Sequence, residues 1–326
     1  MKHKFDLISV GDTQYDVFLE LQEETKLFKD SETQKEYLGV VFAEKIPVKS
    51  YTPVAAVGNS ANVAIGVSRL GLKAAFYTHL AKDQIGKEEF GVFKDENVST
   101  DYVVWDPKRG SNFSAVLNYK GERTILVHHE PRPYNLPKLA KAKWMYFSSL
   151  AAGHEKLHVQ IPEYVRKYSV KLAFNPGSHQ LKEGLDVLAP ILQETHVLLV
   201  NKDEAKTLLG NSDDIKELLQ GLRAQGPKIV VITDDGKGSY CFDGLHMYHL
   251  DIVKVPVVEM TGAGDAYSTG FVSSLALDFE TKDAMRWGAM NGASVVGQIG
   301  ARAGLLTRSE MERMLKEHSA IQPVLI

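Results

Sequence analysis

Short apolar runs bounded by Gly, Pro, Asn or Asp recur along the chain, and patterns of helical spacing lie between most of them. The runs cover residues 5–10, 73–78, 144–148, 171–175, 197–200 and 229–233. Short buried strands that alternate with helices are typical of a parallel sheet covered by helices. The alternation therefore predicts an α/β fold with a doubly wound, largely parallel sheet flanked by helices.

Two segments interrupt this alternation. Residues 17–55 are polar and contain isolated strand-like pieces, and residues 101–128 are rich in β-branched and aromatic residues with the pattern of hairpins. Two β-rich insertions in an α/β domain predict a small β-sheet set apart from the main one, as a lid over a site. We expect one domain over residues 1–326, with 17–55 and 101–128 as the lid insertions.

Composition and charge exclude several classes of protein. The chain is 44% hydrophobic and 24% charged, as in ordinary globular proteins, and its formal net charge of -3 offers no basic surface for nucleic acid. Its single cysteine, Cys241, excludes an internal disulfide framework. The first apolar run is too short for a signal peptide, and no later run reaches membrane-spanning length. We expect a cytoplasmic protein that binds no nucleic acid and no membrane and acts on a small molecule.

The stretch EMTGAGDAYSTGF, residues 259–271, suggests a reactive site. Residues 246–258 are strand-like, and residues 266–277 carry apolar side chains at helical spacing. The stretch TGAGD therefore lies at the N-terminus of a helix, where the first backbone N–H groups have no partner within the helix. Because Gly262, Ala263 and Gly264 carry no bulky side chain, an anion could reach those groups.

Asp265 places a carboxylate beside this predicted anion site. Amides that hold developing negative charge, next to an acid that orients an attacking hydroxyl, suit phosphoryl transfer. The competing interpretation is an aspartate that only caps the helix after a glycine-rich turn. These residues alone do not decide between the two.

Six stretches together resemble a known family. EMTGAGDAY is similar to the D-T-x-G-A-G-D-x-F signature of the PfkB, or ribokinase-like, sugar and nucleoside kinases. Four more stretches follow the family's order along the chain: Gly11 with Asp16 five residues later, residues 57–62 (G-G-x-x-x-N in the family), residues 201–204 (N-x-x-E) and residues 233–238. Residues 291–304 resemble the family's closing helix and loop beside the adenine. The chain departs from the pattern with Val57 for the first glycine, Glu259 and Met260 before the anion site, and Tyr267 for Phe.

This resemblance implies roles on the acceptor side of the site. Asp16, which we expect at the carboxyl end of the first strand, would accept hydrogen bonds from two neighbouring hydroxyls of a polyol. Gly58 and Asn62 would border the same polyol, and Asn112 in the lid would touch the sugar. The competing interpretations are a solvated loop acid for Asp16 and a polar residue in the first turns of a helix for Asn62.

The resemblance also implies a nucleotide side. Thr233, Gly236 and Asn291 would border ATP, and Glu204 would organise Mg²⁺ through water, since this ion keeps much of its hydration and prefers carboxylate oxygen. Glu204 could instead be a first-turn acid that stabilises a helix. Asn201 is either the N-cap of that helix or a phosphate contact. A monovalent cation is a further possible requirement.

We interpret the chain as an ATP-dependent kinase that phosphorylates a primary hydroxyl of a sugar or sugar-like acceptor. The alternatives are a nucleoside kinase, with lid aromatics stacking on a base, and a non-catalytic sugar- or nucleotide-binding protein. A binder would need neither Asp265 nor Glu204. The resemblance further suggests a homodimer that pairs through the lid sheet.

One competing motif points to different chemistry. Residues 154–158 read His-Glu-Lys-Leu-His, a literal H-E-x-x-H, which on a helix places two zinc-binding histidines on one face. The surroundings predict the exposed start of an amphipathic helix, and Pro162 follows where a zinc-binding helix would continue. No third ligand is evident, so a zinc hydrolase is the least favoured interpretation.

Overall fold

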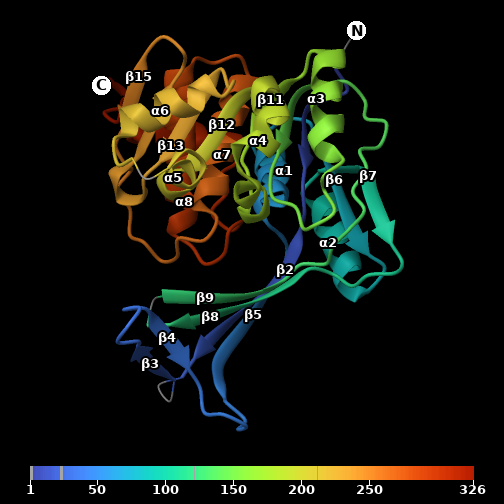
Figure 1. Ribbon diagram of the computed structural model, residues 1–326, viewed down its shortest axis with the longest axis vertical. Helices are drawn as coiled ribbons and strands as arrows, with labels where there is room; N and C mark the ends of the chain where they lie inside the picture. The colour runs from blue at the N-terminus through green and yellow to red at the C-terminus, as the bar shows by residue number, and fades with distance from the viewer. Residues whose placement is uncertain (1–2, 23–24, 121, 211) are drawn as a thin grey trace.

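The computed structural model describes residues 3–22, 25–120, 122–210 and 212–326. A ten-stranded sheet forms the body of the molecule (Figure 1). Its strands, in spatial order, are β16 (Val324–Leu325), β15 (Met247–Leu250), β14 (Ser239–Phe242), β13 (Ile229–Thr233), β12 (Thr195–Asn201), β11 (Lys171–Phe174), β10 (Ala142–Phe147), β1 (Phe5–Val10), β6 (Ala74–Ala81) and β7 (Ser99–Asp106). The seven strands from β13 to β7 pair in parallel, and β14, β15 and β16 are antiparallel. The predicted largely parallel sheet is confirmed.

Helices cover both faces of this sheet. On one face lie α3 (Leu157–Tyr168), α4 (Ser178–Glu194), α5 (Lys202–Leu209) and α6 (Ile215–Ala224). On the other lie α1 (Asn59–Arg69), α2 (Gln84–Asp95), α7 (Ala263–Ala276) and α8 (Thr281–Val296), and α9 (Arg308–Glu317) packs against α8. Along β10, Met145 and Phe147 face the first layer, whereas Trp144 and Tyr146 face the second. Successive residues of a strand point to opposite faces, so strands covered on both sides are continuously apolar.

A second, smaller sheet projects from one end of the body (Figure 1). This small sheet has the order β5 (Val48–Val57), β2 (Gln14–Leu21), β8 (Phe113–Tyr119) and β9 (Glu122–His128), and β3 (Lys26–Lys29) pairs with β4 (Glu36–Gly39) beside it. The parallel pairing of β2 with β8 joins the two predicted β-rich segments in one sheet. Residues 23, 24 and 121 of those segments lie outside the described residues.

Two details of the sequence-based expectation are wrong. Residues 101–106 belong to β7, which pairs with β6 in the main sheet and not with the small sheet. The strand expected over residues 246–258 ends at Leu250, and residues 251–257 form an irregular segment without strand pairing. Both stretches are rich in β-branched residues, and such residues favour a half-buried extended backbone whatever its partner.

The strand order places a crevice at the carboxyl ends of the central strands. From β1 the chain proceeds through α1 to β6 on one side, and later returns to β10 on the other side. Open α/β sheets bind ligands outside the carboxyl ends of strands at such a reversal. The residues that follow or end these strands are polar: Asp12, Ser148, Asn175, Asn201 and Thr233. Among the described residues, no helix is long and apolar enough to cross a membrane.

Candidate active site

The helix expected after TGAGD is present as α7, and it begins where the sequence predicts. Its N-cap is Gly262, whose backbone φ of 79° lies in the left-handed region. A Cβ atom at this position would lie 2.4 Å from the Cβ of Ala301. Both the backbone conformation and the lack of space therefore require glycine here.

The first turn of α7 offers unpaired backbone donors. The N–H of Ala263 donates to the carbonyl of Met260, and that of Ala266 donates to Gly262. Within the described part of the chain, no acceptor contacts the N–H groups of Gly264 and Asp265. A Cβ atom added to Gly264 would meet no atom within 4 Å, so open space lies beside this turn. Free amides at a helix N-terminus that faces open space can hold an anion.

Asp265 lies in this first turn but does not cap the helix. Its Oδ2 accepts a hydrogen bond of 2.7 Å from Nδ2 of Asn62 on α1. Burial raises the pKa of Asp265 to about 6, and the hydrogen bond from Asn62 opposes the rise. The interpretation of Asp265 as a mere N-cap is therefore wrong. Its carboxylate is ionised at neutral pH and has the basicity of a general base.

Asn201 and Glu204 form a reciprocal cap at the start of α5. The side-chain oxygen of Asn201 accepts from the N–H of Glu204 at 2.8 Å, and a carboxylate oxygen of Glu204 accepts from the N–H of Asn201 at 2.8 Å. The two roles left open for Asn201 are thereby decided in favour of the N-cap. Only its amide nitrogen remains free for a ligand.

Glu204 and Asp265 face the same small cavity. The cavity has a volume of about 100 Å³, and its polar lining also includes Asn59, Asn175 and Thr233. Burial raises the pKa of Glu204 to about 7, and the charge of Asp265 adds to the rise. Two carboxylates that face one cavity attract a hard cation, which prefers oxygen ligands. The residues present therefore fit Mg²⁺.

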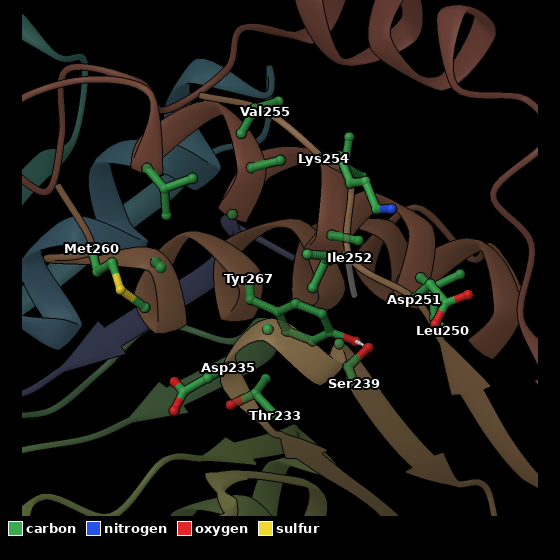
Figure 2. Close-up of a pocket in the computed structure, with 18 of the residues that line it drawn as sticks. Thr233, Asp235, Ser239, Leu250, Asp251, Ile252, Lys254, Val255, Met260 and Tyr267 are labelled. Carbon is green, nitrogen blue, oxygen red and sulfur yellow. Dashed lines mark hydrogen bonds between the residues drawn. The ribbon is translucent and has the colours of Figure 1, made fainter. Parts of the chain in front are cut away.

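A larger, mostly apolar cavity adjoins the polar one (Figure 2). Its volume is about 320 Å³, and Thr233, Gly264 and Tyr267 line both cavities. The hydroxyl of Tyr267 donates to Ser239 at 2.9 Å, which fixes its ring in the wall. The rest of the lining comes from the irregular segment after β15 and from one side of α8: Ile252, Val253, Val255, Val257, Ala289, Gly292, Ala293 and Val296. An apolar slot that ends at a polar, anion-binding end suits a nucleotide.

Of the three residues predicted to border the nucleotide, two line this cavity. Thr233 and Gly236 are part of its wall. Asn291 is fully buried instead, with Nδ2 donating to the carbonyl of Ala266 at 2.7 Å and Oδ1 accepting from Leu306 at 3.0 Å. Because its whole amide is hydrogen-bonded inside the protein, Asn291 joins α8 to α7 and does not lie in the cavity wall.

Asp16 lies on β2 of the small sheet and not at the end of the first strand. It is 6% exposed and accepts a hydrogen bond of 3.0 Å from Gln14, so it is not a solvated loop acid. Burial raises the pKa of Asp16 to about 6, and the charge of Glu259 contributes. Glu259 begins the stretch that leads into α7, so Asp16 belongs to the neighbourhood of the anion site.

The other predicted acceptor-side residues have different outcomes. Gly58 is the N-cap of α1 with φ of 112°, and a Cβ atom there would lie 3.3 Å from the carbonyl oxygen of Asp12. Asn62 contacts Asp265, and its own Oδ1 is buried without a hydrogen-bond partner among the described residues. Asn112 donates to the carbonyl of Thr13 at 2.9 Å and accepts from the N–H of Glu130 at 3.0 Å, so its amide ties loops together, and its contact with a sugar stays a prediction.

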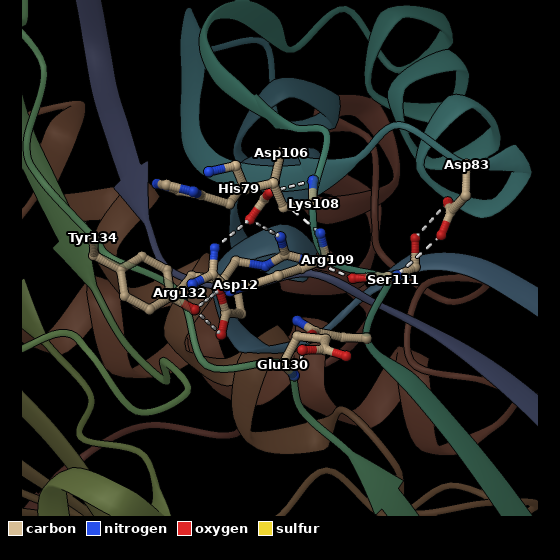
Figure 3. A network of polar contacts seen from close by, with 12 residues as sticks. Asp12, His79, Asp83, Asp106, Lys108, Arg109, Ser111, Glu130, Arg132 and Tyr134 are labelled. Carbon is tan, nitrogen blue, oxygen red and sulfur yellow. Dashed lines mark hydrogen bonds and ion pairs between the residues drawn. The ribbon is translucent and has the colours of Figure 1, made fainter.

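The sequence-based prediction missed a buried polar network beside this region (Figure 3). Asp12, which follows β1 after Gly11, accepts from the hydroxyl of Tyr134 at 2.6 and 2.7 Å and from the N–H of Ala151 at 2.7 Å. Arg132 pairs with Asp106 at 3.0 Å. Burial raises the pKa of Asp12 to about 6. The signal was an acid directly beyond the first strand, the place where α/β sheets bind ligands.

Comparison with known proteins agrees with this geometry. Residues 35–308 match the family described as pfkB family carbohydrate kinase. The 5-dehydro-2-deoxygluconokinase of Bacillus subtilis is 25% identical, over 80% of this chain and 87% of that protein.

Solved structures give the same result for the fold. A ribokinase of Arabidopsis thaliana complexed with ribose and ATP superposes with a TM-score of 0.79 at 20% identity, covering 95% of this chain and 98% of that one. A nucleoside kinase of Methanocaldococcus jannaschii gives a TM-score of 0.73 at 19% identity, covering 97% and 100%. Since the family match spans most of the chain, the protein belongs to the pfkB family of carbohydrate kinases and is a phosphotransferase with an alcohol group as acceptor.

Proposed function

We propose that the protein transfers the γ-phosphoryl group of ATP to a primary hydroxyl of a sugar or sugar-like acceptor, with Mg²⁺. One observation carries this proposal: the acids Asp265 and Glu204 face one polar cavity, which adjoins an apolar slot large enough for a nucleotide. The polar cavity, with Glu204, Asp265 and the free amides of Gly264 and Asp265, is called the transfer centre below. A protein that only bound a nucleotide would not need a base there.

The chain's own groups account for the transfer step. The apolar slot holds the adenine and ribose, and the free amides of α7 receive the negative charge of the transferred phosphoryl group. Asp265 accepts the proton of the acceptor hydroxyl as oxygen bonds to phosphorus and the bond to the leaving diphosphate breaks. Asn62 keeps the Asp265 carboxylate in place through its 2.7 Å hydrogen bond.

Glu204 would hold Mg²⁺ through its carboxylate oxygens, directly or through water, and the side-chain N–H groups of Asn201 could donate to a phosphate oxygen beside the ion. The bound ion would neutralise charge on the phosphates. The pKa of Glu204, raised by burial and further by the charge of Asp265, supports this role, because such a carboxyl gains most from a neighbouring cation. We include a monovalent cation in the proposal.

The acceptor binds between the small sheet and the transfer centre in this proposal. Asp16 offers two buried carboxylate oxygens to neighbouring hydroxyls. The aromatic side chains of the small sheet do not favour a nucleoside acceptor. Phe42 is 94% exposed, Tyr37 is 51% exposed, and Tyr119 donates its hydroxyl to the carbonyl of Thr25. The matching family and a named relative are carbohydrate kinases, so a sugar or sugar acid is the favoured acceptor.

The test is an ATP-consumption screen over pentoses, hexoses, keto-sugar acids, phosphosugars and nucleosides. We expect one class of sugar or sugar acid to be phosphorylated with Mg²⁺, and Asp265→Asn, run in parallel, to stay near background. If only nucleosides are phosphorylated, the acceptor is a nucleoside and not a sugar or sugar acid. Ligand-induced stabilisation without turnover by any acceptor would indicate a binding protein.

We further propose a homodimer that pairs through the small sheet. β9 is an edge strand, and its residues Leu126 and Val127 are 58% and 57% exposed. An apolar, unpaired edge favours pairing with another strand, and a second copy would cover it. Light scattering at micromolar concentration should give twice the chain mass of 36.2 kDa. A monomer would contradict the proposal.

Because the reaction uses ATP and Cys241 is a free thiol, we place the protein in the cytoplasm.

A further inference from the structure

A second cluster of polar side chains lies away from the transfer centre, on the face of the sheet covered by α3 and α4. His154, His158 and Glu183 each offer one ligand atom, and these atoms all lie within 4.8 Å of one another. His154 and His158 are buried, and the side chain of Glu183 is 25% exposed. Neither cavity of the proposed kinase site includes any of these residues.

Local backbone geometry brings the three residues together. The helix α3 begins only at Leu157, so His154 lies in the turn before it and His158 in its first turn. Within α4, Gly184 has a non-helical φ of 80°, which breaks the helix immediately after Glu183. α3 and α4 pack against each other, so the broken first part of α4 places its carboxylate against the histidine pair.

This arrangement differs from the one expected from the H-E-x-x-H pattern. The two histidines are buried and not on an exposed helix start, and α3 continues through Pro162 to Tyr168. Glu155, the general base of a zinc hydrolase, is exposed to solvent on the helical turn. The third ligand that the sequence did not reveal is Glu183. The histidines therefore meet a carboxylate without forming a hydrolase site.

The hydrogen bonds of this cluster are incomplete. Both ring nitrogens of His154 face acceptors, the carbonyl of Ala151 at 2.7 Å and Oε1 of Glu183 at 3.1 Å. A neutral imidazole has one N–H and cannot donate to both. In the described part of the chain, Nε2 of His158 and Oε2 of Glu183 are buried without a hydrogen-bond partner. A cation between the rings and the carboxylate would satisfy Oε2 of Glu183, a buried oxygen that the protein leaves unpaired.

We propose that His154, His158 and Glu183 form a binding site for a divalent transition metal, with Zn²⁺ as the ion of choice. Ligand atoms about 2.1 Å from a tetrahedral zinc lie roughly 3.4 Å from each other. Oε1 of Glu183 lies 3.1 Å from Nε2 of His154, and Oε2 of Glu183 lies 3.7 Å from Nδ1 of His158. The two distances, one from each carboxylate oxygen, lie on either side of that value. Two imidazoles with one carboxylate suit zinc, whereas Mg²⁺ prefers oxygen alone.

The fourth position would be taken by water on the exposed side of Glu183. The bound ion would clamp the turn after β10 to the start of α4. Ala151 belongs to that turn, and it accepts from His154 while its N–H donates to Asp12. The hydrogen bond from Nδ1 of His154 to this carbonyl would also fix the ring so that Nε2 faces the metal. The site is therefore structural, and it stabilises the turn that holds Asp12.

The experiment uses the full chain without an affinity tag, stripped with a chelator and titrated with ZnCl₂ in the absence of nucleotide and Mg²⁺. Calorimetry and elemental analysis should give one zinc per chain, with a rise in melting temperature. Glu183→Gln, which keeps the side-chain volume, should weaken zinc binding by at least about tenfold, because even outer-shell partners of a metal contribute that much. Glu155→Gln is the matched control and should bind zinc like the unchanged chain.

Two outcomes would overturn the site. The first is that the unchanged chain does not bind zinc in a saturable, one-to-one manner. This outcome does not depend on the folding of any variant. Alternatively, Glu183→Gln and Glu155→Gln could bind zinc equally, which would place the ion elsewhere. Circular dichroism of both metal-free variants verifies that they are folded, and anomalous scattering at the zinc edge would locate the ion directly.

Discussion

The transfer centre and the small sheet are assembled in different ways. The transfer centre is set by short stretches of chain: Gly262 starts α7, and Asn201 with Glu204 caps α5 over four residues. The small sheet depends on strands distant in the sequence, since β2 pairs in parallel with β8 almost a hundred residues later. Reactive groups are thus fixed by local backbone geometry on a rigid sheet, whereas the acceptor region depends on long-range pairing.

This difference implies a division of function. Changes in the transfer centre should lower the rate of transfer and leave affinity for the acceptor unaltered. Changes in the small sheet should weaken acceptor binding and leave the chemistry intact. The two regions meet at Asn62. This residue lies on α1, which begins directly after β5 of the small sheet, and its side chain donates a hydrogen bond to Asp265.

The largest expected effect comes from Asp265→Asn. Asparagine keeps the shape and can still accept from Asn62, so the melting temperature should not change. It removes the base, and general-base contributions are about 10²- to 10⁴-fold, so kcat should fall by that factor. Steady-state kinetics with a parallel measurement of ATP affinity tests this. A variant with normal kcat would remove Asp265 from the mechanism.

Gly264→Val should have the next largest effect. The space around this residue is open, so the fold should tolerate valine, but the side chain would occupy the region beside the free amides. Loss of one such donor costs about 10²- to 10³-fold in kcat. Gly264→Ala, with a single methyl group, should lose much less. If both variants turn over normally, the anion does not bind at this turn.

Asp16→Ala tests the other half of the comparison. Losing a hydrogen bond to a charged group costs about 1.5–3 kcal/mol, which corresponds to an acceptor KM about 10- to 150-fold higher. The affinity for ATP and the limiting kcat should stay close to their original values. Asp16→Asn retains one acceptor oxygen, so its acceptor KM should lie between that of the unchanged chain and that of Asp16→Ala. An unchanged KM would place the acceptor away from the small sheet.

The smallest effect is expected from pH. Burial raises the pKa of Asp265 and of Asp16 to about 6, so both carboxyl groups take up protons as pH falls through that value. Because the base must be ionised, kcat/KM at saturating Mg²⁺ should be level above pH 7 and decline below about pH 6. In the Asp265→Asn variant, the residual kcat should no longer fall as the pH is lowered through 6. A flat profile down to pH 5 in the unchanged chain would contradict the assignment.

The features predicted correctly from the sequence are those with a local cause. Glycines before an apolar helix predict its N-terminus, so the start of α7 was located correctly from the stretch TGAGD. The capping box of Asn201 and Glu204 has the same local origin. The central strands were found because each is a continuous apolar run between polar residues.

The errors concern groups whose partner is remote in the sequence. Extended, β-branched residues at 101–106 could pair with either sheet, and only the tertiary fold puts them beside β6. The buried amide of Asn291 was interpreted as a ligand contact because nothing local shows that both of its ends are already hydrogen-bonded. Glu183 was missed as a partner of His154 for the same reason.

The most direct test of the division between the two regions is a crystal structure with a non-hydrolysable ATP analogue, Mg²⁺ and the acceptor identified by the screen. We predict that the primary hydroxyl lies about 2.6–3.2 Å from the carboxylate of Asp265 and in line with the γ-phosphorus, and that other hydroxyls of the acceptor donate to Asp16. An acceptor whose hydroxyl lies beyond hydrogen-bond reach of Asp265, with the γ-phosphate away from the start of α7, would contradict it.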